Sequence, residues 1–339
     1  MKKTKAKNYY SQTGTLIKSA LLGYCLMWPV LVFGQAGSSA PLKNLSAVDS
    51  LASGSAFLEE TVLPRGVLKL ATEERFLFWV ELDAGKLHVL EVNAEGGMDT
   101  RQIIPISIGK NGFGKNLEGD RKTPVGVYRM TSFLTDEQLI DYYGLGAFPL
   151  NYPNVIDRQV GRTGSGIWLH GLPKGVASRP LWDSDGCVVI ANDSLSELQQ
   201  YITTGISHIV LSDDALTWVG RSEVELRRNS LADAFEAWRQ SWESKDNAAY
   251  LDFYADDFDD FMRRKSQWAE YKSRVNDNKN WIRVSTSKVS FYADLKQPEL
   301  VTVRYYQDYE SSNYTWRGWK EQLWRESSLG WKIVYEGNG

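Results

Sequence analysis

Two residues whose side chains can do nucleophilic chemistry together stand close in the sequence: His170 and, 17 positions later, Cys187. A thiolate attacks a carbonyl carbon far better than a thiol does, yet a free cysteine is mostly protonated near neutral pH. A neighbouring imidazole can accept that proton and later return it to a leaving amine. The pair therefore predicts acyl transfer at a cysteine, with Cys187 as the nucleophile and His170 as the base.

Glycine stands beside both residues. Gly171 follows the histidine, and Gly186 precedes the cysteine in the run Ser184-Asp185-Gly186-Cys187. The carbonyl of Gly171 could accept the Nδ1–H of the His170 ring and so orient it. Gly186 permits a tight turn, and the backbone N–H groups of Gly186 and Cys187 could then face a developing oxyanion.

Each residue taken alone has a plainer interpretation. A lone cysteine is usually a small buried apolar residue, and a lone histidine is usually a hydrogen-bonded core residue. The chain has three histidines, and His88 and His208 lie within or just before strand patterns, so we predict structural roles for them. Only His170 combines with a cysteine and with glycines, which favours chemistry there. A poised Cys187 should react quickly with alkylating agents near neutral pH.

The N-terminal segment predicts export. Lysines precede a mostly apolar run over 20–33, and Gly34-Gln35-Ala36 supplies the small residues that a signal peptidase reads. We predict a signal peptide over 1–36 and a periplasmic location, with membrane contact only if this segment stays uncleaved. Cleavage would remove Cys25 and leave Cys187 as a lone thiol, which cannot form an intramolecular disulfide.

The composition excludes several classes of partner. Without residues 1–36, which carry five basic and no acidic side chains, the chain has 34 basic and 42 acidic residues, a net charge of −8. An acidic chain without a basic stripe argues against nucleic acid. No histidine or cysteine spacing suits a metal, and we predict no metal and no cofactor. The stretch 109–115 has the glycine and lysine spacing of a phosphate loop, but Asn116 replaces the Ser or Thr, so we predict a plain loop.

Short strands and one helix must position the pair. Alternating apolar residues over 76–80 and an apolar run over 87–92, with a glycine-bearing turn between them, predict a β-hairpin. Further short apolar runs separated by Gly- and Pro-bearing turns follow. The helix that we predict here covers 193–202, with Asn192 or Asp193 as its cap. This part of the chain is therefore a mainly β domain.

A different pattern begins at Ser230. Apolar residues at 231, 235, 238 and 242 fall at helical spacing behind a Ser230 cap, and a second helix is predicted over 248–261. The four strands predicted after these helices cover 282–291, 300–309, 316–325 and 331–335. Helices followed by a meander of strands indicate an α+β domain with helices packed on one curved antiparallel sheet.

Eight of the 13 tryptophans lie in this second part of the chain. Trp316, Trp319, Trp324 and Trp331 could stack on sugar rings, although burial in the core is the interpretation that we favour. The predicted segments are a signal peptide over 1–36, a linker over 37–63 with a short helix near 47–58, a catalytic domain over 64–215, a charged linker over 216–229 and a second domain over 230–339.

The order of these motifs resembles the catalytic domain of L,D-transpeptidases of the YkuD type. His170-Gly171 followed by Ser184-x-Gly186-Cys187 looks like the family's active-site signature, and the stretches 106–110 and 119–128 resemble its N-terminal half. The resemblance spans about 75–212 and implies a β-sandwich-like fold, with Cys187 as nucleophile, His170 as base and the Gly171 carbonyl orienting the ring. It also implies a peptidoglycan stem peptide as donor. The thiolate would attack the carbonyl at the L-centre of diaminopimelate, expel D-alanine and form a thioester.

Two positions depart from the family's pattern. Asp185 stands where the family usually has histidine, and Val189 stands where it often has arginine. An acid beside a thiol raises the thiol pKa unless the acid points away or pairs with a cation. We expect Ser184, Asp185 and Gly186 to line the substrate and oxyanion side of the site. The departures resemble a branch of L,D-carboxypeptidases and of hydrolases that free peptidoglycan-attached protein.

The C-terminal pattern is similar to nuclear-transport-factor-2-like (NTF2-like) domains, which some cell-shape carboxypeptidases of the family carry after the catalytic domain. The resemblance therefore implies a peptidoglycan-modifying cysteine enzyme, either a transpeptidase or an L,D-carboxypeptidase, with a glycan or a protein as ligand of the C-terminal domain. The sequence leaves the acceptor open. The alternative is a non-catalytic cell-wall-binding protein with a degenerate active site.

Overall fold

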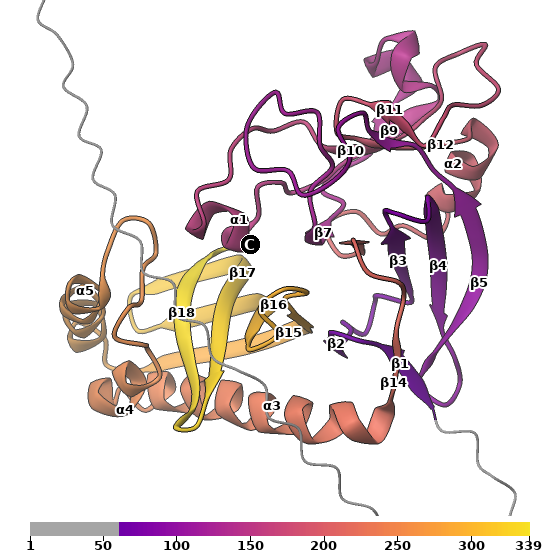
Figure 1. Ribbon diagram of the computed structural model, residues 1–339. Helices are drawn as coiled ribbons and strands as arrows, with labels where there is room; N and C mark the ends of the chain where they lie inside the picture. The colour runs from indigo at the N-terminus through magenta and orange to yellow at the C-terminus, as the bar shows by residue number, and fades with distance from the viewer. Residues whose placement is uncertain (1–60) are drawn as a thin grey trace, which may run out of the picture. The chain divides into compact units, whose positions relative to one another are not determined.

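The computed structural model describes residues 61–339 (Figure 1). The predicted signal peptide over 1–36, Cys25 and the predicted helix near 47–58 lie outside the described residues. A mainly β catalytic domain is followed by an α+β domain with helices and one large antiparallel sheet, which confirms the predicted fold class. Within residues 61–339, no helix is both long enough and apolar enough to cross a membrane.

A five-stranded sheet of the catalytic domain joins the two ends of that domain's sequence. Its strand order is β5-β4-β3-β13-β7. β3 and β4 form the predicted antiparallel hairpin, whereas β13 returns from far along the chain and lies parallel to β3. The strands are β3 (Phe76–Glu81), β4 (Lys86–Val92), β5 (Met98–Pro105), β7 (Gly126–Arg129) and β13 (His208–Ser212).

A second, four-stranded sheet with the order β12-β10-β9-β8 carries the histidine. β10 (Trp168–Gly171) lies antiparallel to β9 (Gly146–Pro149) and parallel to β12 (Val188–Ile190), and Figure 1 shows these three strands together beside helix α2. One apolar core, which includes Phe78 of the first sheet and Leu169 of the second, packs against both. The remaining elements here are β6 (Ile108–Gly109), β8 (Leu134–Thr135), β11 (Trp182–Ser184), α1 (Val155–Gln159) and the 3-10 turns Asp136–Gln138 and Asp141–Tyr143.

Helix α2 (Asn192–Gln199) lies where a helix is predicted, but the predicted cap is wrong. The N-cap residue is Ala191, and no side chain caps the helix. The side chain of Asn192 bridges two loops instead: it accepts from the Leu145 N–H at 3.0 Å and donates to the Leu172 carbonyl at 2.9 Å. An asparagine can satisfy either a helix end or a nearby loop, and the sequence does not show which one is within reach.

Helix α3 (Arg221–Glu243) begins well before the predicted Ser230 cap, which is a correction. Its N-cap is Gly220, and Val224 is buried two turns ahead of Leu231. Apart from Leu226, which is exposed, the other residues of this first part of the helix are charged or polar, so the apolar period does not show in the sequence. Most of the segment predicted as a linker over 216–229 is therefore helical.

Strand β1 (Val62–Pro64) shows that the chain is already ordered at the end of the segment predicted as a linker over 37–63. β1 pairs with β14 (Trp218–Gly220), which directly precedes α3. Three-residue strands are too short to show a period of two in the sequence.

The four strands predicted for the C-terminal domain are confirmed, and each extends further than predicted. They form consecutive antiparallel hairpins in the order β18-β17-β16-β15. Figure 1 shows α3 running beside this sheet, and residues of α3 share a core with it. The strands are β15 (Ile282–Ala293), β16 (Leu300–Ser311), β17 (Tyr314–Ser327) and β18 (Gly330–Asn338).

Residues 67–69 were assigned to the catalytic domain without a predicted strand, yet they form strand β2 (Val67–Lys69), which adds to the edge of the C-terminal sheet. It pairs antiparallel with Phe291 and Tyr292 of β15. The N-terminal stretch of the described chain therefore contributes to the C-terminal domain. The described residues belong to one compact unit, and the domain boundaries at 64, 215 and 230 stay predictions.

The second predicted helix of the C-terminal domain, 248–261, is wrong in its extent. Only α4 (Asn247–Asp252) is helical there, because acidic side chains beyond it bond to the backbone. Asp260, for example, accepts from the Met262 N–H at 2.9 Å. A later helix, α5 (Lys265–Asp277), was missed, because its buried face includes Lys272 and Asn276 beside a single tryptophan.

The preference for tryptophans as core residues is confirmed for two of the four named. Trp324 and Trp331 are buried among the apolar residues of the C-terminal domain, whereas Trp316 and Trp319 are partly exposed. Trp324 and Trp331 are therefore unavailable for stacking on a sugar.

Candidate active site

His170 lies near the end of β10 and is fully buried. Its Nδ1 is 2.7 Å from the carbonyl oxygen of Gly171, the arrangement that the sequence predicts. A carbonyl oxygen can only accept a hydrogen bond, so Nδ1 carries the proton in the neutral ring and Nε2 carries the lone pair. Nε2 is buried and makes no hydrogen bond to the protein. The ring is thus held as a neutral imidazole with a free basic nitrogen.

Electrostatics keep this ring neutral. Burial lowers the pKa of His170 to about 4, more than the hydrogen bond to Gly171 raises it, and the positive charge of Arg179 lowers it further. The ring is therefore unprotonated at neutral pH, as a general base must be, although the same burial makes it a weaker base than a free imidazole.

Cys187 directly precedes β12, the parallel neighbour of β10. In this register Val189 pairs with His170, so Cys187, two positions earlier, stands opposite Trp168 and on the same face of the sheet as His170. The thiol is partly exposed, and Sγ lies 3.4 Å from the carbonyl oxygen of Gly166. The topology therefore brings the cysteine and the histidine to adjacent strands.

The resting cysteine is a thiol. Burial raises the pKa of Cys187 to about 11, against an opposing hydrogen bond from the Trp168 backbone, and the carboxylate of Asp185 raises it further. The expectation of fast alkylation near neutral pH stays a prediction, and the raised pKa argues against it because it leaves a small thiolate fraction. Cys187 and His170 both rest neutral, so any attack by this sulfur would require transfer of the thiol proton.

The turn before the cysteine is held by Ser184, which is fully buried. Ser184 Oγ donates to the Cys187 carbonyl at 2.6 Å and accepts from the Gly186 N–H at 3.1 Å. Gly186 has φ of +126°, and a Cβ there would lie 2.9 Å from the Lys122 carbonyl oxygen, so only glycine suits this turn. The Gly186 N–H would have to leave Ser184 to bind an oxyanion, and its oxyanion role stays a prediction.

Thr123 ties this turn to the rest of the domain. Its hydroxyl donates to the Gly186 carbonyl at 3.0 Å and accepts from the Gly109 N–H at 3.0 Å. The side chain is fully buried, and Gly109 belongs to β6, which pairs with β11. One hydroxyl therefore links the turn before the cysteine to strand β6.

Asp185 is exposed and lies 3.6 Å from Lys110 and 3.6 Å from Arg121. Two cations therefore partly neutralise the acid that replaces the family's usual histidine. Pairs of this kind at an exposed position are screened by solvent, and the carboxylate still raises the pKa of Cys187.

Aromatic rings enclose the histidine. The Tyr143 ring packs edge-on against His170 with centroids 5.1 Å apart, and it lies 4.7 Å from the Trp168 ring. The Tyr142 ring lies 6.0 Å from His170 on the same 3-10 turn. These contacts desolvate the imidazole, which explains why burial dominates its pKa.

Sequence reasoning missed Thr123, Tyr143, Arg179 and Asn192. Thr123 lies inside the stretch 119–128 that carries the family resemblance, so a signal was available there. Asn192 was interpreted as a helix cap. A side chain on Gly171 or Gly144 would overlap Asn192 Oδ1, so this asparagine explains both glycines.

The stretch with phosphate-loop spacing is a loop, as predicted. Lys115 is buried and pairs with Asp120 at 2.8 Å, so it is not available to a phosphate. Although burial opposes it, hydrogen bonds from Lys115 and from backbone N–H groups lower the pKa of Asp120 to about 2. In the described part of the chain, no three His, Cys, Asp or Glu side chains cluster as metal ligands. The histidines His88 and His208 are buried beside Glu81 and Glu74, consistent with structural roles.

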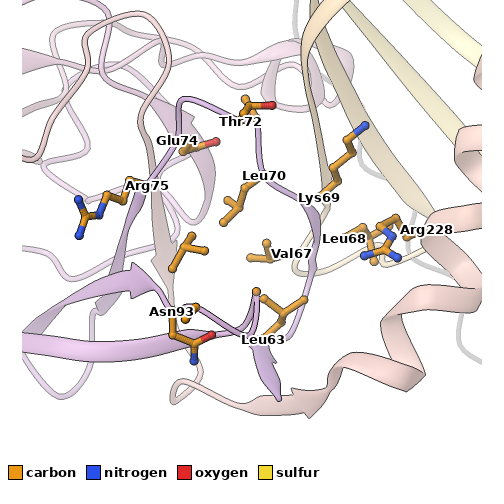
Figure 2. A pocket seen from close by; sticks show the side chains of 14 residues that line it. Leu63, Val67, Leu68, Lys69, Leu70, Thr72, Glu74, Arg75, Asn93 and Arg228 are labelled. Carbon is orange, nitrogen blue, oxygen red and sulfur yellow. The ribbon is translucent and has the colours of Figure 1, made fainter. Parts of the chain in front are cut away.

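A hollow of about 560 Å³ lies away from these groups and is shown in Figure 2. Its wall combines apolar side chains such as Leu63 and Val67 with the charged groups of Lys69, Glu74 and Arg228. None of the predicted site residues lines it. We place the candidate site at the cysteine and the histidine because acyl transfer needs a nucleophile and a base, and the hollow has neither a cysteine nor a histidine in its lining.

Comparison with known proteins identifies the family of both domains. The family model of the L,D-transpeptidase catalytic domain (YkuD) matches residues 77–211, and the model of the Cds6 C-terminal NTF2-like domain matches 230–337. The solved structure of Bdellovibrio bacteriovorus Bd1075 is 31% identical, with a TM-score of 0.65, over 82% of this chain and 98% of that one. The helical cell shape determining protein Pgp2 from Campylobacter jejuni is 25% identical, with a TM-score of 0.64, over 82% of this chain and 94% of that one.

The curated proteins contain no match. The match to Bd1075 extends over both domains and nearly the whole of that chain. The protein therefore belongs to the L,D-transpeptidase family of the YkuD type, in the group whose catalytic domain is followed by an NTF2-like domain.

Proposed function

We propose that the protein is an exported, periplasmic enzyme that forms a thioester between Cys187 and a peptidoglycan stem peptide. The Cys187 thiol gives its proton to Nε2 of His170 as the sulfur attacks the carbonyl carbon at the L-centre of diaminopimelate. The C–N bond to the terminal D-alanine then breaks, and His170 passes the proton to the leaving amine. The shortened stem peptide remains attached to sulfur.

Water completes the proposed cycle. His170 takes a proton from a water molecule as its oxygen attacks the thioester carbonyl, and the same proton returns to the departing sulfur. The net reaction is hydrolysis of one peptide bond, so the activity is that of an L,D-carboxypeptidase. Water is favoured as the acceptor because Asp185 and Val189 depart from the family pattern in the way that its carboxypeptidase branch does.

The observation that carries this proposal is the state of His170. Its Nδ1 is bound to Gly171, its Nε2 is free, and it lies on the strand next to Cys187. Nε2 of His88 also makes no hydrogen bond, but it faces the Glu81 carboxylate at 3.4 Å, whereas His170 has a cysteine on the neighbouring segment, and this combination favours a catalytic role. The same observation argues against the alternative of a cell-wall-binding protein with a degenerate site. A glycan or protein ligand for the C-terminal domain stays a prediction.

Incubation of the purified chain with a defined disaccharide tetrapeptide, followed by mass spectrometry of the products, tests the proposal. Tripeptide plus free D-alanine indicates the carboxypeptidase, and cross-linked dimers indicate a transpeptidase. In a parallel incubation with a muropeptide that carries a linked protein, release of that protein indicates a protein-releasing hydrolase. Cys187→Ala should abolish each of these, whereas His88→Asn, which changes a histidine outside the site, should retain activity. Turnover by Cys187→Ala, or no product and no covalent adduct with the unmodified chain, would refute the proposed chemistry.

A further inference from the structure

Arg179 comes from the connection between β10 and β11 and is nearly buried, with its side chain 10% exposed. Its Nε donates to the Asp183 carboxylate at 2.8 Å, and its Nη2 donates to the Asp183 carbonyl. Nη1 is buried and makes no hydrogen bond of good geometry, although hydrogen bonding to the Tyr142 hydroxyl is, after Asp183, among the causes that raise the pKa of Arg179 against the effect of burial. Asp183 therefore fixes one edge of the guanidinium and leaves Nη1 without a charged acceptor.

This guanidinium lies close to the reacting groups. Its centre is 5.7 Å from the Tyr142 ring, and that ring is 6.0 Å from the ring of His170. Burial is the largest cause for both groups, since it lowers the pKa of His170 and raises that of Cys187, and the charge of Arg179 lowers both pKa values. Arg179 therefore lies near both His170 and Cys187.

A buried cationic N–H needs an anionic partner, because leaving it unsatisfied is costly. The residue that leaves in the proposed reaction carries a free carboxylate one Cα beyond the nitrogen that His170 protonates. A group near His170 can therefore reach that carboxylate while the scissile carbonyl faces Cys187. Val189, which replaces an arginine common in the family, is buried and apolar and cannot supply this contact.

We propose that Arg179 binds the terminal carboxylate of the donor peptide through Nη1 and thereby selects stem peptides with a free C-terminal end. The inference rests on the proposed function and names the substrate class of the same site. Arg179 is a specificity-determining residue, since it touches the leaving residue and takes no part in the proton transfers. A donor whose terminal carboxyl group is already linked, or is amidated, would lose the charged acceptor.

The test uses binding, so that it does not depend on turnover. Titration calorimetry on the full chain with Cys187→Ala compares the free tetrapeptide with the same peptide amidated at its C-terminus. We expect the free carboxylate to bind about ten- to a hundredfold more tightly. Adding Arg179→Gln should remove that preference by weakening the free peptide and leaving the amide nearly unchanged.

Two further variants control for folding. Arg179→Lys keeps the charge but not the geometry and should retain part of the preference. Asp183→Asn weakens the contact that holds Arg179 and should reduce the preference without abolishing it. Equal weakening of both peptides by Arg179→Gln, an unchanged preference, or no measurable binding of either peptide would overturn the inference.

The same experiment separates this inference from the proposed function. A carboxylate preference that depends on Arg179, in a chain that never forms product or thioester, would sustain the inference and refute the function. Product formation at equal kcat/KM from the free and the amidated peptide would sustain the proposed function and refute the inference about Arg179.

Discussion

The catalytic domain and the C-terminal domain each bury a set of ionisable groups, and the two sets differ in their access to a possible substrate. In the catalytic domain, His170 and Arg179 each keep one nitrogen without a hydrogen-bond partner. In the C-terminal domain, Lys272 of α5 and Glu336 of β18 are buried and lie 3.8 Å apart. Glu336 Oε1 also lacks a hydrogen-bond partner, but side chains enclose it, whereas His170 lies on the strand beside a partly exposed cysteine.

Aromatic and polar side chains surround Lys272 and Glu336. Lys272 Nζ lies over the rings of Trp242 and Trp268 at 4.3 and 4.6 Å, and Glu336 Oε2 accepts from Tyr254 at 2.7 Å and from Gln322 at 3.0 Å. Burial lowers the pKa of Lys272 to about 8, although the carboxylate opposes this. These groups contribute to the specific packing of the domain. A shifted pKa therefore marks a reactive group only where a free atom and access accompany it.

The largest effect should come from removing the unbonded Nε2 of His170. His170→Asn keeps an N–H for the Gly171 carbonyl but removes the base, so kcat for tetrapeptide cleavage should fall by about 10²- to 10⁴-fold. The melting temperature should change little, because the hydrogen bond to Gly171 is retained. Steady-state kinetics and calorimetry measure both quantities. A fall in stability that accounts for the whole loss of activity would show that His170, like Lys272 and Glu336, has a structural role.

Changes to the enclosed pair, Lys272 and Glu336, should lower stability rather than activity. Glu336→Ala leaves Lys272 buried without its carboxylate, and the free energy of unfolding should fall by about 3–5 kcal/mol. Urea denaturation measures this loss. The double change Lys272→Met with Glu336→Leu should recover only part of it, because no unpaired charge remains but Tyr254 and Gln322 lose their acceptor. Loss of tetrapeptide cleavage in a double variant of normal stability would contradict a structural role.

The pH dependence of stability should reveal His170 and disappear with it. The folded pKa, about 4, is below the unfolded value near 6.5, so the unfolded chain binds the proton more readily. Stability is therefore fully present above about pH 6.5 and is lost as the pH falls towards 4, by up to about 3 kcal/mol. Subtraction of the urea-derived curves of His170→Asn from those of the unmodified chain isolates this contribution. A flat difference between pH 4 and 7 would mean that the ring is not buried in its neutral form.

The smallest effect concerns the acid beside the cysteine. Asp185→Asn removes a charge that raises the pKa of Cys187, but Asp185 is exposed and paired with two cations. Alkylation of Cys187 at pH 8 should become faster by only about two- to threefold. The rate of iodoacetamide labelling, followed by mass spectrometry, measures it. A slower rate would show that Asp185 assists the thiol through its cations.

Sequence patterns correctly predicted the β-hairpin and the four C-terminal strands. They also singled out His170 and Cys187, which the fold brings to adjacent strands. They failed where polar residues occupy a buried face, as Lys272 and Asn276 do in α5, because an apolar period is the signal for a helix. They also failed for β2, a three-residue strand that joins the sheet of the other domain.

The amino-acid sequence by itself determined the chemistry that is available: one histidine and one cysteine with glycines beside them, in the order typical of the family. Tertiary structure alone decided which nitrogen of His170 is free, that both reacting groups rest neutral, and that Arg179 lies near them. Those properties depend on burial and on contacts between segments far apart in the chain. Such contacts leave no periodic trace in the sequence, whereas local hydrogen bonds and alternating apolar residues do.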